Sequence, residues 1–442
     1  MQKIITITLI CILIAFSQSC RKSDYSLPQE AGVISDQGEG TGTLTWKKGE
    51  EIILQGFVFV NDGQTLTIEA GAVIKFKEGQ GATASALIVA RGGTIIANGT
   101  PEEPIIFTSE LDPLDGSLPK DSFGLWGGLI ILGDAPLNTS TGEAFIEGIP
   151  NSEPRALFGG TDPEDSSGEI SYVSIRYPGT ILNEGNEING LTLGGVGVNT
   201  KIDHIEIINS ADDGIEIFGG NVNIRHAICL NAHDDIIDFE LGYQGNIQFV
   251  LGLQKEQVGD NIMEANGGLD PVFSLPISRP TIANATFIGN SRTSNSCITY
   301  ANFAAGITAN SIFYNTSSGV RNEYFDGQTD SYSQWEREVL KIESNIFYNV
   351  AGNIENDMFH LYGGQINEEA INLWKAYFNG GSNEILDLGL SLDGNVKLAP
   401  DIPTDNNLYP LNDWFEVTNY KGAIGTYDWT DGWTIYKEFI QD

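Results

Sequence analysis

The residues best suited to chemistry are acids that recur at a fixed interval in the middle of the chain. Residues 202–217 (IDHIEIINSADDGIEI) and 224–239 (IRHAICLNAHDDIIDF) are identical at six of 16 aligned positions. The acids that this alignment superimposes are Asp212 with Asp234, Asp213 with Asp235, and Glu216 with Asp238. Clustered carboxylates of this kind bind hard divalent cations or act as general acids and bases.

The interval between the two units suits one coil of a parallel β-helix, in which each coil stacks on the one before it. Parallel strands lie about 4.8 Å apart, so equivalent residues of successive coils become neighbours in space. Because side chains alternate along a strand, Glu216, Asp238 and Glu240 point outward together when the apolar residues between them point inward. Asp260 follows Asp238 by the same interval and extends this file of acids.

Three uses of the stacked acids remain open. Like charges at this spacing repel each other by roughly 1 kcal/mol in water and by more in a partly dry cleft, so a bound cation such as Ca²⁺ would stabilise them. The candidate calcium ligands are Asp212, Glu216, Asp234, Asp238 and Glu240. A catalytic use would employ Asp213, Asp234 and Asp235. The third interpretation is an exposed acidic stack that only discourages aggregation.

The catalytic alternative rests on a resemblance. Polygalacturonase-type β-helix hydrolases carry an Asn-Thr-Asp segment and, one coil later, an Asp-Asp pair, which residues 209–214 (NSADDG) and 233–235 (HDD) resemble in spacing. Inverting hydrolysis also needs an acid and a base about 6.5–9.5 Å apart. The Gly-His-Gly and Arg-Ile-Lys segments of those hydrolases have no counterpart in this sequence, which argues against hydrolysis. A Ca²⁺-dependent lyase would need a basic residue, and the nearby candidates are Arg176, Lys201 and Arg225.

Other features of the repeat concern the fold. Residues 170–176 match residues 202–208 at the start of the unit, with a longer offset that predicts an inserted loop around residues 183–190. His204 and His226 fall in register, and we interpret them as paired surface or turn histidines rather than as a metal site. Later units end in recurrent asparagines such as Asn315, which predict stacked turn residues.

The composition is typical of a secreted, turn-rich protein. The 442 residues include 59 acidic and 23 basic side chains, and the formal net charge of −36 argues against binding to nucleic acid or to an anionic membrane surface. Glycine accounts for 52 residues, and short apolar stretches bounded by turn residues recur from Trp46 onward, which predicts an all-β fold. Cys229 and Cys297 belong to the folded body, where we expect two free buried thiols, with a single disulfide between them as the alternative.

The N-terminus has the features of a secretory signal. Lys3 precedes an apolar run over residues 4–16, which is too short for a transmembrane helix. The sequence Ser-Gln-Ser-Cys that ends at Cys20 resembles a bacterial lipobox, which implies acylation of this cysteine and a membrane anchor. Cleavage near Ser19 by ordinary signal peptidase is the alternative. By resemblance to lipoprotein sorting rules, Arg21 favours the outer membrane.

We expect a signal peptide, a lipid-anchored flexible tether, a β-helix and a C-terminal cap, over residues 1–19, 20–43, 44–359 and 360–442. Within the cap, residues 367–378 (NEEAINLWKAYF) have helical spacing. Trp414, Trp429 and Trp433 follow, and we expect them to pack on the β-helix. An aromatic sugar-binding surface is the competing interpretation.

Several segments resemble a family of lipoproteins from Bacteroidota. They are residues 56–69 (GFVFVNDGQTLTIE), 86–93 (ALIVARGG), 104–109 (PIIFTS), 126–133 (WGGLIILG), 186–195 (NEINGLTLGG) and 211–216 (ADDGIE). The resemblance implies a right-handed parallel β-helix of the pectate-lyase-like class and a location in the cell envelope, and it implies no particular reaction. The expected fold is therefore an all-β solenoid, a right-handed parallel β-helix with a small C-terminal cap that contains a helix.

These observations favour a lipoprotein of the outer membrane or cell surface that binds a ligand without catalysis. A glycan is the candidate ligand, and the acids form a candidate Ca²⁺ site. One alternative is a polysaccharide lyase or glycoside hydrolase that uses the same acids. Another is an accessory subunit of an outer-membrane uptake complex, whose partner would be an outer-membrane protein.

Overall fold

The computed structural model describes residues 32–183, 186–254, 258–268, 271–290, 296–325, 329–380, 382–392, 397–400 and 403–440. The expected signal peptide, Cys20 and the first part of the expected tether lie outside these residues. Within the described part of the chain, no helix has the length and apolar character needed to cross a membrane.

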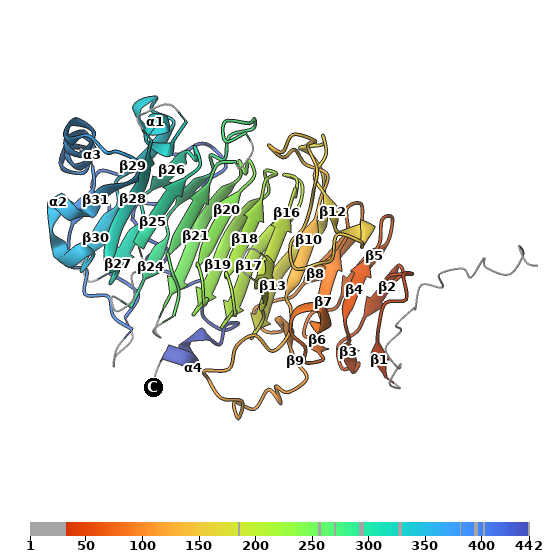
Figure 1. Ribbon diagram of the computed structural model, residues 1–442. Coiled ribbons are helices and arrows are strands. Elements are labelled where there is room, and N and C mark those ends of the chain that lie inside the picture. The colour runs from red at the N-terminus through yellow and green to blue at the C-terminus, as the bar shows by residue number, and fades with distance from the viewer. Residues whose placement is uncertain are drawn as a thin grey trace, which may run out of the picture. The chain divides into compact units, whose positions relative to one another are not determined.

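The described residues form a right-handed parallel β-helix, as the repeat predicts (Figure 1). An 18-stranded sheet contains β1 (Val33–Ile34), β2 (Leu44–Trp46), β3 (Ile52–Leu54), β5 (Thr65–Ile68), β6 (Val73–Phe76), β8 (Thr94–Asn98), β9 (Ile105–Ser109), β13 (Gly168–Arg176), β17 (Lys201–Ile208), β19 (Asn223–Leu230), β21 (Asn246–Leu253), β23 (Thr281–Ala283), β24 (Thr286–Ile288), β26 (Gly306–Ala309), β27 (Ile312–Tyr314), β29 (Leu340–Glu343), β30 (Ile346–Tyr348) and β32 (Glu384–Ile385). A 10-stranded sheet contains β4 (Phe57–Val60), β7 (Ala86–Val89), β10 (Leu129–Leu132), β16 (Leu191–Gly194), β18 (Ile215–Phe218), β20 (Ile237–Glu240), β22 (Met263–Asn266), β25 (Ser296–Ala301), β28 (Ser318–Tyr324) and β31 (Phe359–Gly363).

Two short hairpins and a few helices complete the described structure. The hairpins are β11 (Ala144–Phe145) with β12 (Leu157–Phe158), and β14 (Thr180–Asn183) with β15 (Asn186–Ile188). The α-helices are α1 (Ser331–Glu336), α2 (Glu355–Met358), α3 (Glu368–Gly380) and α4 (Tyr436–Ile440). The 3₁₀ turns are η1 (Gly81–Thr83), η2 (Pro154–Ala156) and η3 (Ala351–Asn353).

The observed strand register confirms the repeat read from the sequence. Strands β17 and β19 pair Ile202 with Ile224, and strands β18 and β20 pair Glu216 with Asp238, so both pairings keep the alignment of the two units. Strands β13 and β17 pair Ile170 with Ile202, which is the longer offset expected for that coil. The extra residues of that coil form the hairpin β14–β15, where the sequence predicts an inserted loop.

Stacked asparagines form one corner of the coils, as predicted for the later units. Asn315 and Asn349 have φ angles of 57° and 52°, and the Asn349 Nδ2 group donates to Asn315 Oδ1 at 2.7 Å. Asn209 and Asn231 occupy the same corner of earlier coils with φ angles of 55° and 53°. Asparagine tolerates this left-handed conformation better than most residues, and its amide adds a hydrogen bond between coils.

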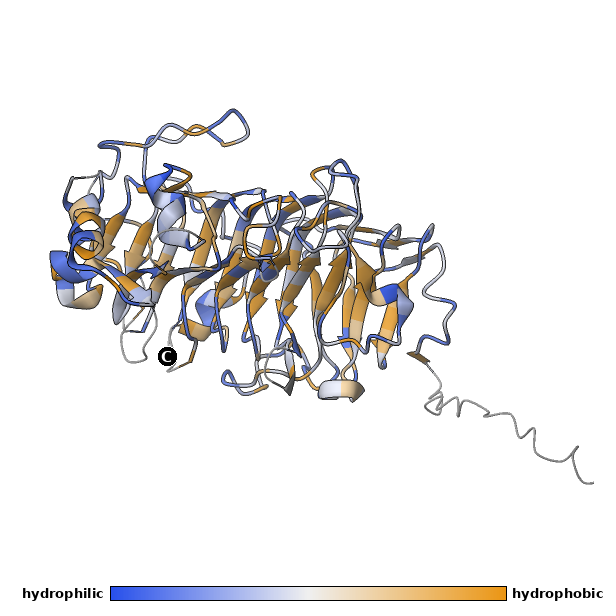
Figure 2. Ribbon diagram, turned by 45° about the horizontal axis from the view of Figure 1, so that its top comes forward, coloured by the Kyte–Doolittle hydropathy of each residue, from blue (hydrophilic) through white to orange (hydrophobic). Residues whose placement is uncertain are grey.

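The interior of the β-helix is one continuous apolar core, and Figure 2 shows apolar residues concentrated along the strands. Phe287, Phe313 and Phe347 stack on successive coils with ring centroids 5.4 and 5.2 Å apart. Cys229 and Cys297 are free and buried, as expected. Because one coil cannot bury its apolar side alone, the stacking of coils supplies this core.

Segments that follow the repeats cover the last coil and one outer face. Helix α3 forms where residues 367–378 predict a helix, and its Trp374 packs on Phe359 of β31 with ring centroids 5.0 Å apart. The chain then runs back over the 18-stranded sheet, where Trp429 and Trp433 are buried. Trp414 lies under the guanidinium of Arg225, 4.3 Å from ring centroid to Cζ. The burial of Trp429 and Trp433 favours packing over a sugar-binding surface.

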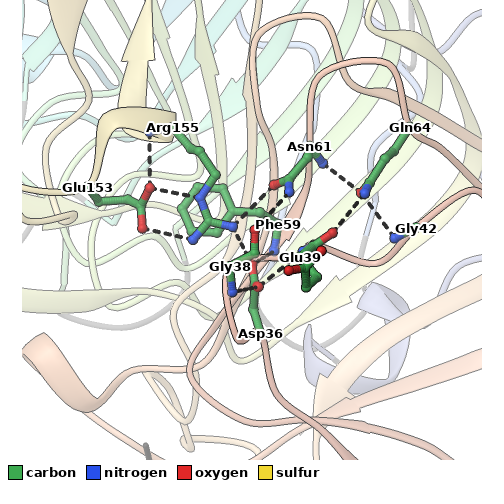
Figure 3. A network of polar contacts seen from close by, with 10 residues as sticks. Asp36, Gly38, Glu39, Gly42, Phe59, Asn61, Gln64, Glu153 and Arg155 are labelled. Carbon is green, nitrogen blue, oxygen red and sulfur yellow. Dashed lines mark hydrogen bonds and ion pairs between the residues drawn. The ribbon is translucent and has the colours of Figure 1, made fainter. Parts of the chain in front are cut away.

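A polar network closes the first edge of the 10-stranded sheet (Figure 3). Residues 36–42 lie along β4, the edge strand, and the Thr41 amide donates to the Phe59 carbonyl at 2.7 Å. Asp36, whose side chain is 1% exposed, forms an ion pair of 2.6 Å with Arg155. Arg155 also pairs with Glu153 at 2.7 Å and covers the Phe59 ring at 3.8 Å. The network therefore protects an edge that would otherwise be open to pairing.

Replacing Arg155 with alanine leaves the buried Asp36 carboxylate without its guanidinium partner. We expect the free energy of unfolding to fall by about 3 kcal/mol, measured by denaturant titration. The matched control is Lys201→Ala, because Lys201 pairs with Glu169 at an exposed site, and its loss should cost less than about 1 kcal/mol. Equal losses in the two variants would refute a special role for the network.

Candidate functional site

The repeated acids gather on the outer face of the 10-stranded sheet and in the turns that precede its strands. We call this group the acidic file, and it comprises Asp212, Asp213, Glu216, Asp234, Asp235, Asp238, Glu240, Asp260 and Glu264. Ile215 and Ile217 point into the core, which directs Glu216 outward between them. On the next strand, Asp238 and Glu240 lie outside in the same way, flanking the buried Phe239. The predicted direction of these acids is therefore confirmed.

The place of Asp260 differs from the prediction. Strand β22 pairs Glu264 with Asp238, and the Asp260 amide donates to the Asp234 carbonyl at 3.1 Å. Asp260 therefore stacks on Asp234 rather than on Asp238, because this coil is longer than the one before it. Glu264, which the repeat did not single out, takes the place in line with Asp238. In the sequence, Glu264 lies between the apolar residues Met263 and Ala265. This alternation weakly indicates that Glu264 points outward.

Two of the acids belong to a ladder of hydrogen bonds between coils. The Asp213 amide donates to Asn189 Oδ1 at 3.1 Å, and the Asp235 amide donates to Asp213 Oδ1 at 2.7 Å. The Asn261 amide completes the series by donating to Asp235 Oδ1 at 2.5 Å. Burial and neighbouring acids raise the pKa of both aspartates well above the usual range. Asp213 and Asp235, two of the three catalytic candidates, thus have a structural role in this turn.

On the outer face, buried oxygen atoms lack hydrogen-bond partners. Asn189 donates its Nδ2 hydrogen to the Glu216 carboxylate. Within the described residues, Asp238 Oδ1 is buried and accepts no hydrogen bond. The hydroxyl of Thr192, which pairs with Glu216 in register and is 1% exposed, also has no partner there. Since nearly all buried polar atoms in proteins are satisfied by protein or water, these oxygens are available to a water molecule or a ligand.

Burial among other acids raises the pKa values across the site. The pKa of Asp212 rises to about 8, through burial first and then through the charge of Asp234. The pKa of Glu240 rises to about 7 and that of Asp234 to about 6, with burial as the main cause in each. Glu147, on the loop that covers this face, has its pKa raised to about 7. No basic side chain among the described residues forms an ion pair with the acidic file.

Three overlapping sets of carboxylates converge closely enough to hold metal ions. Within each set, one oxygen per residue lies within 4.8 Å of the others. The sets are Asp212 with Asp213 and Asp234; Asp213 with Glu216 and Asp238; and Asp234 with Asp235 and Asp260. Such hard oxygen ligands suit Ca²⁺. Four of the five ligands predicted from the sequence belong to these sets, and Glu240 lies beside them on β20.

The basic residues considered for catalysis lie away from the acidic file, on the 18-stranded sheet. Lys201 pairs with Glu169, and Arg225 is held by Trp414. Arg176 is buried, and its Nε group donates to Ser174. Arg321 of β28 is a basic residue on the 10-stranded sheet, which carries the acidic file. The spacing of the repeat did not identify it. It lies two strands beyond Glu264 in register, outside the two units that the sequence alignment compares.

The predicted histidine pair is present and is also a close cluster with Asp203. His204 Nδ1 and His226 Nδ1 lie 2.8 and 2.7 Å from the same Asp203 oxygen. The two rings stack 4.2 Å apart at an angle of 24°. Both Nδ1 atoms are therefore within hydrogen-bond distance of one carboxylate oxygen of the chain itself. The two histidines lie within β17 and β19, so the structure places this pair on strands and not in a turn.

The raised pKa values of Asp212, Asp234 and Glu240 predict a characteristic pH dependence. The folded protein keeps these groups protonated where the unfolded chain, with ordinary values near 4, has released the protons. In a metal chelator, the free energy of unfolding should therefore fall as the pH rises from about 4 to about 8. Thermal unfolding at intervals over this range measures the slope. A melting temperature that is constant between pH 5 and 8 would contradict it.

Comparison with protein-family models supports the fold directly. Residues 38–384 match the family model described as "Pectate-lyase like beta helix domain". A solved structure, the pectin methylesterase from Aspergillus niger, is 12% identical over 80% of this chain and 97% of its own, with a TM-score of 0.26. No curated protein shows a significant match to the chain. Since the family model spans most of the chain, the protein belongs to the family of pectate-lyase-like β-helix domains.

Proposed function

We propose that this protein is a non-catalytic binding protein of the cell envelope and that its acidic file binds Ca²⁺. The observation that carries the proposal is the unpartnered, buried Asp238 Oδ1, which belongs to a residue in one of the three carboxylate sets. A divalent cation would supply the missing contact, and it would replace the protons that burial otherwise retains on the file. The Thr192 hydroxyl, in line with Glu216, offers a neutral oxygen nearby.

The carboxylates of the site differ in their access to solvent. Asp260 is exposed and Asp234 reaches solvent with part of its side chain, whereas Asp213 and Asp235 are buried. An ion can therefore meet the exposed carboxylates first and exchange its water for protein oxygens. This arrangement of graded burial supports reversible binding rather than a permanently enclosed structural ion.

The geometry supports binding better than catalysis. Asp213 and Asp235 accept backbone hydrogen bonds in the ladder, which orients their carboxyl groups toward the turn. The basic residues suggested for a lyase, Arg176, Lys201 and Arg225, belong to the other sheet. A lyase or hydrolase would need both an available acid and a base near the substrate.

An aromatic platform beside the acidic file supports a glycan as the ligand. Phe123 is 44% exposed, and its ring packs on that of His233 with centroids 3.7 Å apart. The loop that carries it is fixed, because the Asn209 side chain donates to the carbonyls of Lys120 and Ser122. An aromatic face beside carboxylates that can accept hydroxyl hydrogens is suited to a sugar ring.

Calcium should raise the melting temperature of the wild-type protein, because the ion binds only the folded acidic file. The double variant Asp234→Asn with Asp238→Asn should lose this increase. In chelator, the free energy of unfolding of this variant should also decrease less as the pH rises. Differential scanning fluorimetry with CaCl₂ and with EDTA measures both effects. An unchanged wild-type melting temperature at millimolar Ca²⁺ would refute the cation site.

The glycan part of the proposal uses the same proteins on a panel of neutral and acidic polysaccharides. We expect Phe123→Ala to abolish retention that wild type shows, and we expect no reducing ends or unsaturated products. Tyr427→Ala is the matched control, because Tyr427 is 78% exposed and lies in the C-terminal segment, on the side of the other sheet. Product formation that Asp235→Asn abolishes would instead establish the enzymatic alternative.

We also propose that acylated Cys20 anchors the protein to the outer membrane or cell surface, with Arg21 favouring that membrane. The support is the lipobox-like Ser-Gln-Ser-Cys sequence after an apolar run. A partnership with an outer-membrane protein would follow from that location. Metabolic labelling with a palmitate analogue should mark the wild-type protein and leave Cys20→Ala unmarked. Continued labelling of the variant would disprove acylation at this residue.

A further inference from the structure

Glu147 lies outside the repeated units, yet its side chain reaches the same face of the 10-stranded sheet as the acidic file. It belongs to residues 144–158, which run from β11 to β12 and which we call the covering loop. Its carboxyl group is hydrogen-bonded to that of Glu216, and its charge raises the pKa of Asp212 and Glu240. An acid from a non-repetitive segment is therefore a close neighbour of acids on two successive coils.

The covering loop fixes the position of this acid from both sides. Ile146 and Ile149 are 1% and 3% exposed, and both pack in the apolar cluster on the outer face of the sheet. Between them, the Gly148 amide donates to Asn186 Oδ1 at 2.8 Å. A Cβ atom at Gly148 would lie 2.1 Å from Cγ1 of Ile188, and its φ angle of 70° also favours glycine. The backbone that carries the acid is thus held tightly against the sheet.

Two oxygen atoms of the sheet lack a hydrogen-bond partner beside the carboxyl group that the loop acid contacts. Thr192 is 1% exposed, and its hydroxyl points outward because Leu191 and Leu193 on either side belong to the core. This hydroxyl has no partner within the described residues, and Thr192 pairs in register with Glu216. Glu216 pairs in turn with Asp238, whose Oδ1 is the second unpartnered atom. The unsatisfied oxygens therefore flank Glu216 on both neighbouring strands.

A cation would satisfy these groups together. Among the described residues, none of the three carboxylates, those of Glu147, Glu216 and Asp238, forms an ion pair with a basic side chain. Carboxylates and a hydroxyl are the hard oxygen donors that Ca²⁺ prefers, and this ion tolerates irregular geometry. A bound water would satisfy the hydroxyl but would leave the repulsion between the carboxylates in place.

We propose that Glu147 is a calcium ligand supplied by the covering loop, and that it completes a site formed with Thr192, Glu216 and Asp238 of the sheet. The inference rests on the proposed binding of Ca²⁺ by the acidic file, and it adds a ligand from outside the repeat. The ion contacts the sheet and the loop at once. Its affinity therefore depends on a segment that the repeated coils do not contain.

Isothermal titration of the full chain with CaCl₂ tests this role. Glu147→Gln keeps the size of the side chain and removes one charged ligand, so the affinity for Ca²⁺ should fall by about tenfold or more. In EDTA at pH 8, the same variant should melt at a higher temperature than wild type, because repulsion among the acids is reduced. Thr192→Val should also raise the melting temperature in EDTA, since it removes an unsatisfied buried hydroxyl, and it should weaken Ca²⁺ binding.

Matched variants separate failure of this inference from failure of the calcium site. Glu102→Gln makes the same chemical change at an exposed position outside the acidic file, and it should alter the affinity by less than about twofold because salt screens distant charges. If wild type binds no Ca²⁺, the proposed function and this inference both fail. If wild type binds Ca²⁺, Asp234→Asn with Asp238→Asn abolishes binding and Glu147→Gln binds as tightly as wild type, only the role of Glu147 is refuted. A lower melting temperature of Glu147→Gln in EDTA would likewise overturn it, because that result indicates a purely structural contact.

Discussion

The stacking of coils at the spacing of parallel strands is the constraint on which this structure depends. Each residue has an equivalent about 4.8 Å away in the next coil, so a repeated residue type becomes a row of neighbours. Rows of phenylalanine, such as Phe313 and Phe347, stabilise the core, and rows of asparagine bond through their amides. A row of carboxylates repels instead, so Glu216 opposite Asp238 indicates a protonated or cation-bound site.

The ladder of hydrogen bonds lies in the turns that precede the strands of the 10-stranded sheet. It shows which feature of these side chains the fold uses. Asn189 shows that a neutral amide oxygen satisfies the backbone N–H of the next coil at this position. Asp213 and Asp235 perform the same task with a carboxyl group, whose pKa burial raises. The exposed Asp234 directly precedes Asp235 in one of the two coils that carry these acids.

Non-repetitive segments decide which parts of the solenoid remain accessible. Phe59, Ile88 and Ile130 lie on the outer face of the first strands of the 10-stranded sheet, and the loop with Phe158 covers them. The C-terminal segment covers the 18-stranded sheet, anchored where buried Glu206 accepts the amides that begin α4. The acidic file begins where the loop that covers these first strands ends. Its partial burial, and hence the raised pKa values, therefore depends on a loop far from it in the sequence.

The sequence by itself determined the length of the coil between the two aligned units, the inward and outward alternation and the pairing of Glu216 with Asp238, because a repeat without insertions converts directly into spatial register in a solenoid. It also indicated the C-terminal helix, through its apolar spacing. The tertiary structure decided the partners that no repeat relates: Glu264 instead of Asp260 opposite Asp238, and Glu147 over the same face. Turn length and long-range loop packing set these contacts, and neither leaves a periodic signal in the chain.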